Sequence, residues 1–382
     1  MALPPADEDP QGLVYVVTGG CGFLGSHLVQ VLLEQEPALR ELRVFDIHLD
    51  PSLAQGPHGG RVRLVQGDVG DAAAVGRVLA GADAVLHAAS LVDVWGRATA
   101  EAIARVNVQG TRNVIAACRA QGVRCLVYTS SMEVVGPNTR GDPFFRGDED
   151  SPYPVHHTEP YPLSKAQAER LVLEANGATA SMGSGTRSWP SSTGGAGPPA
   201  AGCPARCPTA PSTAASTPPH LQPHLQPHLH PCPPSLPPEP APLPGAGNVA
   251  WMHVLAARAA RRRPAAVGGQ VFYCYDGSPY AAYEDFNMLL LGPAGLRLRG
   301  GRPAPRWLLG LLARLNAGLR ALLRPLAAYA PLLNPYTLAV GSTTFSVRTD
   351  KAQRRFGYRP LFTWEQARHR TVAWLRRLPH AS

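Results

Sequence analysis

Near its start the chain passes from an apolar run into a glycine-rich turn and then into a helical pattern. Leu13–Val17 (LVYVV) is rich in β-branched residues, as is typical of a buried parallel strand. TGGCGFLG follows at once, and residues 26–34 then carry apolar side chains at helical spacing. A strand, a tight turn and a helix in this order predict the first unit of a doubly wound parallel α/β sheet.

Three glycines, Gly19, Gly22 and Gly25, give this turn a G-x-x-G-x-x-G spacing. The first lets the chain turn tightly, the second leaves room for a pyrophosphate beside the backbone, and the third lets helix and strand pack closely. The N-terminus of the helix that follows then faces the anion, and Phe23, Leu24 and Gly25 of the turn are expected to contact the cofactor. The spacing therefore indicates a dinucleotide site, although a glycine triplet by itself also occurs in ordinary turns.

Two acidic residues follow later strands. Leu42–Phe45 ends at Asp46, where a carboxylate can hydrogen-bond the adenosine ribose and repel a 2′-phosphate, which favours NAD over NADP. Val62–Val69 contains Asp68, which we expect to meet the adenine or, alternatively, to cap a helix. The alternation continues with strands over 84–89 and 125–129 and a helix over 103–117. In these segments we interpret His87 as a core residue and Asn107 as a bridge between backbones.

Two hydroxyls and a Tyr–Lys pair complete the candidate site. Ser130 and Ser131 come directly after Cys125–Thr129, so they lie at the carboxyl edge of the sheet, where ligands bind. Tyr161 and Lys165 are four residues apart and share one face of a predicted helix. A nearby ammonium lowers the pKa of a tyrosine from about 10. The phenolate can then take a proton from an alcohol while a hydride leaves for a nicotinamide, and a serine can orient the same oxygen.

Residues 178–246 break the α/β pattern. Between Pro190 and Pro244 lie 18 of the 40 prolines, and the charged residues there are Arg206 and Glu239. No apolar periodicity survives, so we expect this insert to be disordered. The repeat HLQPHLQPHLH at 220–230 has histidines at regular spacing, but a low-complexity tract lacks a built second shell, and we predict no metal site.

A second interpretation of this insert is that its reading frame is wrong. Plausible codons for Ala180–Ser184, shifted by one base, encode Ile-Tyr-Gly-Glu, and neighbouring stretches also become ordinary globular sequence. The hypothesis is that about 178–217 is an exon in the wrong frame, that about 218–246 is read-through of non-coding sequence, and that the frame recovers at Gly247.

Charge and apolar content limit the partners. The chain has 36 basic and 27 acidic residues, a net charge of +9, and nearly all of its basic residues are arginine. We expect no nucleic-acid partner, whereas an anionic cofactor and an anionic membrane surface both fit. The seven cysteines show no disulfide spacing and the first residues do not resemble a signal peptide, so a reducing, cytosol-facing location is expected.

A Leu- and Ala-rich stretch over 307–333 indicates a membrane-associated or buried helix. Arg314, Arg320, Arg324 and Pro325 interrupt it. A central arginine costs about 2.5–3.5 kcal/mol in a spanning helix. The pattern therefore favours a helix that lies in the membrane interface, with a buried helix pair as the alternative.

Several stretches resemble the 3β-hydroxysteroid dehydrogenase/Δ5-Δ4 isomerase branch of the extended short-chain dehydrogenases/reductases. They are Val17–Gly25, Val127–Asn138, Pro160–Gly177, Gly247–Ala256, Gly269–Met288 and Pro331–Val340. The last two are most similar to the family member that acts on 7α-hydroxylated 27-carbon sterols in bile acid synthesis. The segment that follows Gly177 in this family, and lines the nicotinamide and substrate, is absent from the sequence as it stands.

The resemblance implies an NAD-dependent enzyme that oxidises a 3β-hydroxy-Δ5-steroid to the 3-oxo-Δ4-steroid. Tyr161 is then the base, Lys165 its partner and a ribose ligand, and Ser131 rather than Ser130 the orienting hydroxyl. The isomerase acid is not identified. The family implies attachment to the endoplasmic reticulum membrane with a cytosol-facing catalytic domain.

The expected organisation is a Rossmann domain over 13–177, the anomalous insert over 178–246, and a smaller substrate-binding and membrane-associated part over 247–382. Two alternatives stay open: a nucleotide-sugar epimerase or reductase of the same fold, and an inactive product of faulty splicing or a misassembled coding sequence. The oligomeric state is also open, with a homo-oligomer as one alternative.

Overall fold

The structure is a computed structural model of the chain. It describes residues 12–94, 96–136, 144–150, 157, 159–176, 201–206, 244–279, 283–295, 304–323, 329, 331, 333–342, 345–347 and 350–377.

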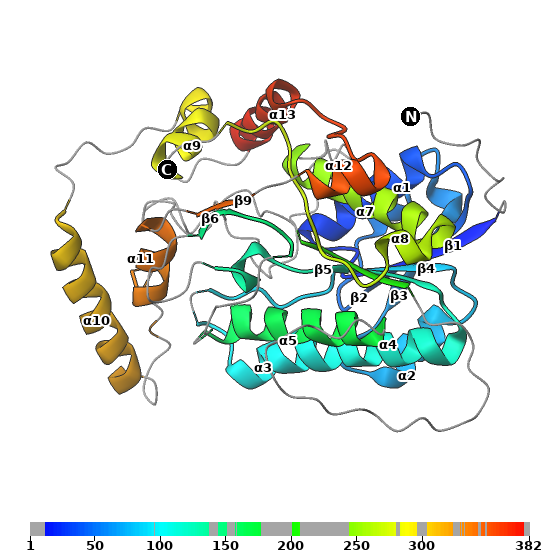
Figure 1. Cartoon of the computed structure of the whole chain (residues 1–382), viewed down its shortest axis with the longest axis horizontal. Helices are drawn as coiled ribbons and strands as arrows, with labels where there is room; N and C mark the ends of the chain where they lie inside the picture. Colours follow the sequence, from blue (N-terminus) through cyan, green and yellow to red (C-terminus); the bar gives the residue numbers. More distant parts are fainter. Residues whose placement is uncertain are drawn as a thin grey trace.

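A parallel sheet forms the centre of the described part of the molecule, with the strand order β3-β2-β1-β4-β5-β7-β8 (Figure 1). The strands are β1 (Leu13–Thr18), β2 (Leu39–Asp46), β3 (Val62–Gln66), β4 (Ala84–His87), β5 (Cys125–Thr129), β7 (Ala201–Arg206) and β8 (Phe272–Tyr273). The order runs outward from β1 in both directions, so the chain reverses between β1 and β4. The predicted doubly wound sheet is confirmed, and its ligand-binding edge lies at this reversal.

Helices cover both faces of the sheet (Figure 1). One face carries α1 (Phe23–Gln35), α7 (Pro244–Arg262), α8 (Pro264–Val267) and α12 (Lys351–Phe356), and the other carries α2 (Ala72–Leu79), α4 (Gly110–Gln121) and α5 (Pro160–Ala175). Side chains alternate along β1 because a strand has a period of two. Tyr15 and Val17 pack in the cluster of α1 and α7, whereas Val14 and Val16 pack in the cluster of α2, α4 and α5.

Shorter elements complete the described chain. A second sheet pairs β6 (Phe144–Gly147) with β9 (Phe345–Val347) in parallel. The remaining helices are α3 (Ala100–Ala104), α9 (Tyr283–Leu291), α10 (Arg306–Leu323), α11 (Pro335–Ser342) and α13 (Trp364–Arg377). The short turns are four 3₁₀ segments, Pro51–Ala54, Gly59–Arg61, Met132–Val134 and Gly292–Ala294, and a π-turn, Arg105–Gln109, between α3 and α4.

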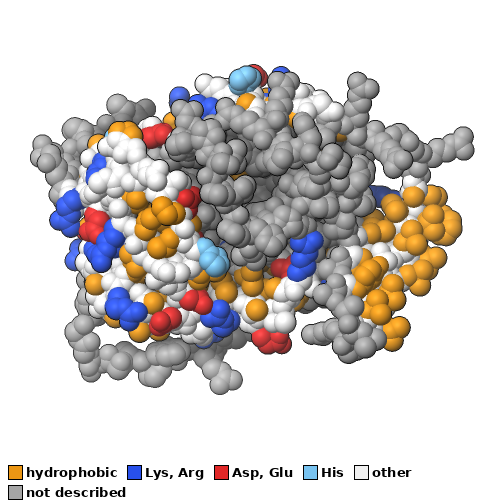
Figure 2. Space-filling model, turned by 180° about the vertical axis from the view of Figure 1, so that it is seen from behind, with side chains coloured by type: hydrophobic (Ala, Val, Ile, Leu, Met, Phe, Trp, Pro, Cys, Tyr) orange, Lys and Arg blue, Asp and Glu red, His pale blue; other side chains and the backbone are white. Residues whose placement is uncertain are grey.

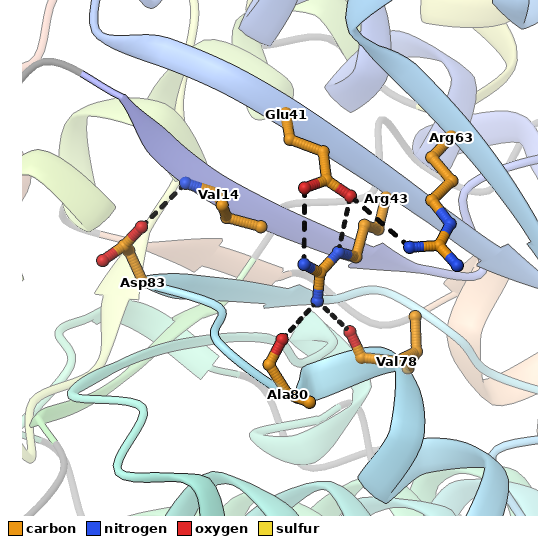
Figure 3. Close-up of polar contacts among 7 residues, drawn as sticks. All are labelled: Val14, Glu41, Arg43, Arg63, Val78, Ala80 and Asp83. Atoms are coloured by element: carbon orange, nitrogen blue, oxygen red, sulfur yellow. Dashed lines mark hydrogen bonds and ion pairs between the residues drawn. The ribbon is translucent and has the colours of Figure 1, made fainter.

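An arginine joins β2 to the end of α2 (Figure 3). Arg43 Nη1 donates to the carbonyl oxygens of Val78 at 2.8 Å and Ala80 at 2.6 Å. Its Nε donates to Glu41 Oε1 at 2.8 Å, which holds the guanidinium in place. A cation at a helix C-terminus satisfies carbonyls that lack intrahelical partners and complements the helix dipole.

Strand β7 corrects one expectation from the sequence. We expected disorder throughout 178–246, yet Ala201–Arg206 pairs with β5 on one side and β8 on the other. A strand in this position gives the backbones of both neighbours a partner, and backbone pairing does not require apolar periodicity. Helix α7 also begins within the insert, at Pro244. The histidine repeat and the proposed frame-shifted stretch outside β7 lie beyond the described residues.

Helix α10 lies at one edge of the molecule (Figure 1), and Figure 2 shows hydrophobic side chains gathered there. Its exposed large apolar residues are Trp307, Leu311, Leu312, Leu315, Leu319 and Leu322. Among the described helices, none has the length together with the apolar content that crossing a bilayer requires.

Candidate active site

The glycine-rich turn has the shape of an anion cradle. Gly19 has φ of +68°, and a Cβ there would lie 2.6 Å from Ala89 Cα. A Cβ on Gly25 would collide with the Gly19 carbonyl oxygen, so the start of α1 packs directly on the turn. Gly22 is exposed, and among the described residues a Cβ there would meet the Gly19 oxygen alone, at 3.2 Å. The open side of Gly22 therefore leaves room for a ligand beside the first turn of α1.

That first turn starts at Phe23 and continues through Leu24 and Gly25. The first amides of a helix have no intrahelical acceptor, so these three N–H groups point out from the positive end of the dipole. Phe23 is 61% exposed, so its ring does not cover this end. The structure thus places the predicted pyrophosphate contacts together.

The two predicted acidic ligands lie in different environments. Asp46 ends β2 and accepts a hydrogen bond from Cys21 N at 3.0 Å, which fixes the carboxylate beside the turn. Asp68 accepts from Gly70 N at 2.7 Å and pairs with Arg105 Nη1 at 2.8 Å. Burial works against the charged form of Asp68, but these two partners hold its pKa below the usual value.

The alternative role for Asp68, a helix cap, is wrong. Asp71 caps α2, since its Oδ1 accepts from the amides of Ala73 at 2.9 Å and Ala74 at 3.2 Å. Asp68 instead shapes the turn that precedes this cap. Contact between Asp68 and an adenine stays a prediction.

The Tyr–Lys pair is buried at the start of α5. Tyr161 is 5% exposed and Lys165 is 3% exposed. Lys165 Nζ donates to the Thr129 carbonyl oxygen at 2.8 Å, at the carboxyl end of β5. The ammonium also lies 5.0 Å from the centre of the Tyr128 ring. Burial lowers the pKa of Lys165 to about 7, although the charge of Glu133 opposes this shift.

The two serines after β5 have different surroundings. Ser131 Oγ accepts from Glu133 N at 3.2 Å and caps the short turn Met132–Val134. Ser130 lies beside Glu169 of α5, a carboxyl whose pKa burial raises to about 8, although the Ser130 hydroxyl opposes this rise. The turn that Ser131 caps packs against α5, so both serines and the Tyr–Lys pair lie at one edge of the sheet.

Sequence reasoning missed Glu133. It is half-buried with its Oε2 shielded from solvent, and burial raises the pKa of its carboxyl to about 7, although Tyr336 of α11 and Lys165 lower it. Tyr336 is 5% exposed and lies close enough to Tyr161 for their charges to interact. A carboxyl with this pKa can gain and lose a proton near neutral pH. The signal available in the sequence was a single acidic residue in the apolar stretch MEVV, directly after the serine pair.

Two supporting residues behave as the sequence indicated. His87 is a core residue, held by Thr18 Oγ1 at 2.6 Å and Thr111 Oγ1 at 3.0 Å, and burial lowers its pKa to about 3. Asn107 is a bridge, because it contacts Leu91 N at 2.7 Å and Leu91 O at 3.0 Å. Its Nδ2 also donates to Ser164 Oγ, on α5, at 2.9 Å. Within the described residues, no group of three or more His, Cys, Asp or Glu could hold a metal ion.

Several known proteins have sequences similar to that of this chain. The profile of the 3-beta hydroxysteroid dehydrogenase/isomerase family matches residues 16–187 and 245–305. Human 3 beta-hydroxysteroid dehydrogenase type 7 is 55% identical over 375 residues, with 96% of each chain covered. The protein of the same name from Mus musculus is 51% identical, with 95% of each chain covered.

Two solved structures have a similar fold. One is titled gox2253, with a TM-score of 0.61, 22% identity and coverage of 97% of this chain and 99% of that chain. The other is the dTDP-glucose 4,6-dehydratase DesIV from Streptomyces venezuelae, with NAD and TYD bound, at a TM-score of 0.59, 20% identity and coverage of 95% and 97%.

Proposed function

Because the chain belongs to the 3-beta hydroxysteroid dehydrogenase/isomerase family, we propose that it oxidises the 3β-hydroxyl of a Δ5-steroid with NAD and then moves the double bond to Δ4. The observation that carries the proposal is the buried Tyr161–Lys165 pair at the same carboxyl edge of the sheet as the glycine cradle. A 7α-hydroxylated 27-carbon sterol of bile acid synthesis is the proposed substrate, because residues 269–288 and 331–340 resemble the family member that uses it.

The residues of the cradle fit NAD. The open side of Gly22 and the first amides of α1 suit a pyrophosphate, and Asp46, held beside the turn by Cys21 N, would accept hydrogen bonds from the adenosine ribose. Lys165 would hold the nicotinamide ribose. When bound, NAD supplies the acceptor for the hydride that leaves C3 of the sterol.

The chain itself moves the proton of the alcohol. Tyr161 takes the proton from the 3-hydroxyl, and Ser131 orients that oxygen. The ammonium of Lys165 favours the phenolate form of Tyr161, and the Thr129 carbonyl at 2.8 Å fixes the ammonium on the same helical face. Nearly complete burial of both side chains strengthens this electrostatic effect.

Glu133 is the proposed proton carrier for the isomerisation. The new 3-ketone makes the C4 proton acidic, so a carboxylate can remove it to give the dienolate, in which C3–C4 and C5–C6 are double bonds. The same carboxyl then returns the proton to C6 as the C4–C5 double bond forms and the 3-ketone is restored, so the shift consumes no external proton. A pKa raised to about 7 by burial suits both steps.

An assay of the full chain with NAD and a 3β,7α-dihydroxy-Δ5-sterol tests this function. NADH absorbance reports the oxidation, and the conjugated enone absorbance reports the isomerisation. Replacing the general base in Y161F should lower kcat by at least about 100-fold. E133Q should form NADH while the 3-oxo-Δ5-steroid accumulates.

The 3α-hydroxy epimer of the sterol is the control substrate and should give no NADH. Turnover of a sugar nucleotide without net NADH would instead favour the epimerase alternative. Wild-type chain that binds NAD in a thermal-shift titration but forms no NADH with the sterol would contradict the proposed function.

Membrane attachment is a separate part of the proposal. The exposed apolar residues of α10 lie on one face of the helix, as in helices that lie in a bilayer interface. A sterol dissolved in lipid makes this location useful, and we propose the cytosolic surface of the endoplasmic reticulum. In flotation with anionic phospholipid vesicles, a variant with Leu311, Leu315 and Leu322 changed to Ser should remain unbound, whereas wild type floats. Equal flotation of both would contradict the assignment.

A further inference from the structure

The loop between β4 and α3 connects the cofactor cradle to the C-terminal part of the chain. At its start Ala89 packs against Gly19, and Leu91 is held on both backbone atoms by Asn107. Its far end turns at Gly96, which has φ of +73°. The loop thus extends from the glycine cradle to this turn.

Asp93 builds the turn from within. Its Oδ1 accepts from Gly96 N at 2.8 Å and its Oδ2 accepts from Ala98 N at 2.6 Å. The side chain is 7% exposed, so a carboxylate is buried here against backbone amides. Such a buried anion favours a nearby cation.

Arg320 of α10 provides that cation. Its Nη2 donates to the Gly96 carbonyl oxygen at 2.9 Å. The guanidinium fills the space where a side chain on Gly96 would lie, since a Cβ there would collide with it. The turn and the arginine therefore fit each other closely.

The same guanidinium acts on the start of the catalytic helix. Glu159 directly precedes α5, and its carbonyl oxygen accepts from Leu163 N at 3.2 Å in the turn that contains Tyr161. Burial raises the pKa of Glu159, the charge of Arg320 opposes this shift, and Asp93 adds to it. The pKa of Glu159 therefore responds to the charges of both Arg320 and Asp93.

Further contacts of α10 lie on the side of the helix that carries Arg320. Ala313, Asn316 and Arg320 follow an i, i+3, i+7 spacing, and Ala313 is 1% exposed. Asn316 Nδ2 donates to Leu333 O at 2.9 Å, just before α11, which carries Tyr336. The opposite side exposes the apolar face.

We propose that Arg320 is a positioning residue that holds the Gly96 turn against α10, and so sets the shape of the loop between β4 and α3 on the substrate side of the active site. The inference rests on the proposed dehydrogenase function. Because the cofactor cradle lies at the other end of the loop, the contact should affect the sterol more than NAD.

Steady-state kinetics of three variants tests the role. R320A should raise KM for the sterol about tenfold, the loss expected for a charge-assisted hydrogen bond, with KM for NAD unchanged. R320K should recover part of the loss, because a cation that can donate to the Gly96 carbonyl oxygen remains. R314A is the matched control, since Arg314 is an exposed arginine of the same helix and its loss removes the same charge. Equal sterol KM values for R320A and R314A would overturn the proposal.

A double-mutant cycle with Gly96 tests the contact itself. G96A should raise the sterol KM in the wild-type background, because its methyl group displaces the guanidinium. In the R320A background the collision partner is gone, so G96A should raise the sterol KM less than it does in wild type, and only the strain of an alanine at positive φ should remain. Multiplicative effects of the two changes would show that they act separately and would overturn the inference.

Hydrogen exchange gives a readout that does not need turnover. The amides of Gly96 and Ala98 should exchange faster in R320A than in wild type or R314A. If wild type forms no NADH with the sterol, the proposed function fails while faster exchange still supports the positioning role. Equal exchange in all three proteins rejects that role, whatever the activity.

Discussion

Three ionisable side chains occur at intervals of four residues on one face of α5: Tyr161, Lys165 and Glu169. All three are at most 5% exposed. Burial disfavours the charged form of any group, so it lowers the pKa of the amine to about 7 and raises that of the carboxyl to about 8. The charge states of Lys165 and Glu169 therefore change within the physiological pH range.

Glu169 should make stability depend on pH. The native carboxyl keeps its proton up to about pH 8, whereas in the unfolded chain it ionises near 4.5. Between these values the native state binds the extra proton, so this group lowers stability as pH rises. The unfolding free energy of E169Q relative to wild type should increase by about 1.4 kcal/mol per pH unit in that window.

Urea unfolding at several pH values between 5.5 and 7.5 measures this difference. E174Q is the matched control, because Glu174 lies on the same helix and is exposed. Its stability relative to wild type should not change with pH. A constant difference between E169Q and wild type would show that the buried carboxyl is ionised in the native state.

At the scale of elements, the strands and helices predicted correctly are those whose signals lie within one short stretch of sequence. The first strand, the turn and α1 agree with their expected positions because apolar spacing and glycines are local signals. The helix predicted over 103–117 became α3, a π-turn and α4. The π-turn contains Asn107, whose bonds to Leu91 and Ser164 come from distant segments, and periodicity does not show such contacts.

Long-range contacts also explain the missed features. Glu133 gains its function from Lys165 and Tyr336, and the latter lies about 200 residues away in sequence. Strand β7 depends on backbone pairing with β5 and β8 rather than on its own side-chain pattern. The tyrosine and lysine were predictable because one helix carries both.

The junction of β2 and α2 allows a prediction for a single element. R43M should lower the unfolding free energy by about 1–3 kcal/mol, because it leaves the carbonyls of Val78 and Ala80 at the helix end without their charged donor. R63M is the control on the neighbouring strand, since Arg63 is 68% exposed and lies 3.9 Å from Glu41. Equal midpoints for both variants in thermal unfolding would show that the contact in Figure 3 contributes nothing.

At the scale of the whole molecule, α7 joins the C-terminal part to the first half of the sheet. Arg258 Nε pairs with Glu36 Oε2 at 3.0 Å, and Tyr15 OH donates to the same oxygen at 3.2 Å. Arg261 Nη1 donates to the Tyr15 hydroxyl oxygen at 3.1 Å. The side chains of Glu36 and Arg258 are 1% and 20% exposed, so removing Glu36 leaves a largely buried guanidinium without its carboxylate.

Removing that carboxylate should test whether the two parts form one cooperative unit. E36A should lower the unfolding free energy by about 3–5 kcal/mol, because Arg258 and Tyr15 lose their common acceptor. D350A is the control: the pair of Arg354 and Asp350 is 3.1 Å long but exposed, and its loss should cost at most about 1 kcal/mol.

Unfolding is followed by tryptophan fluorescence and by far-ultraviolet circular dichroism. Arg258 lies 5.5 Å from the ring of Trp251 on α7, so the fluorescence reports this junction. Because α7 packs on the same core as β1 and α1, both signals should change at one midpoint in each protein, lower in E36A. Separate midpoints in wild type would mean that the Rossmann sheet and the C-terminal part unfold independently, and that the family's two functions, binding NAD and enclosing a sterol, rest on separately stable halves.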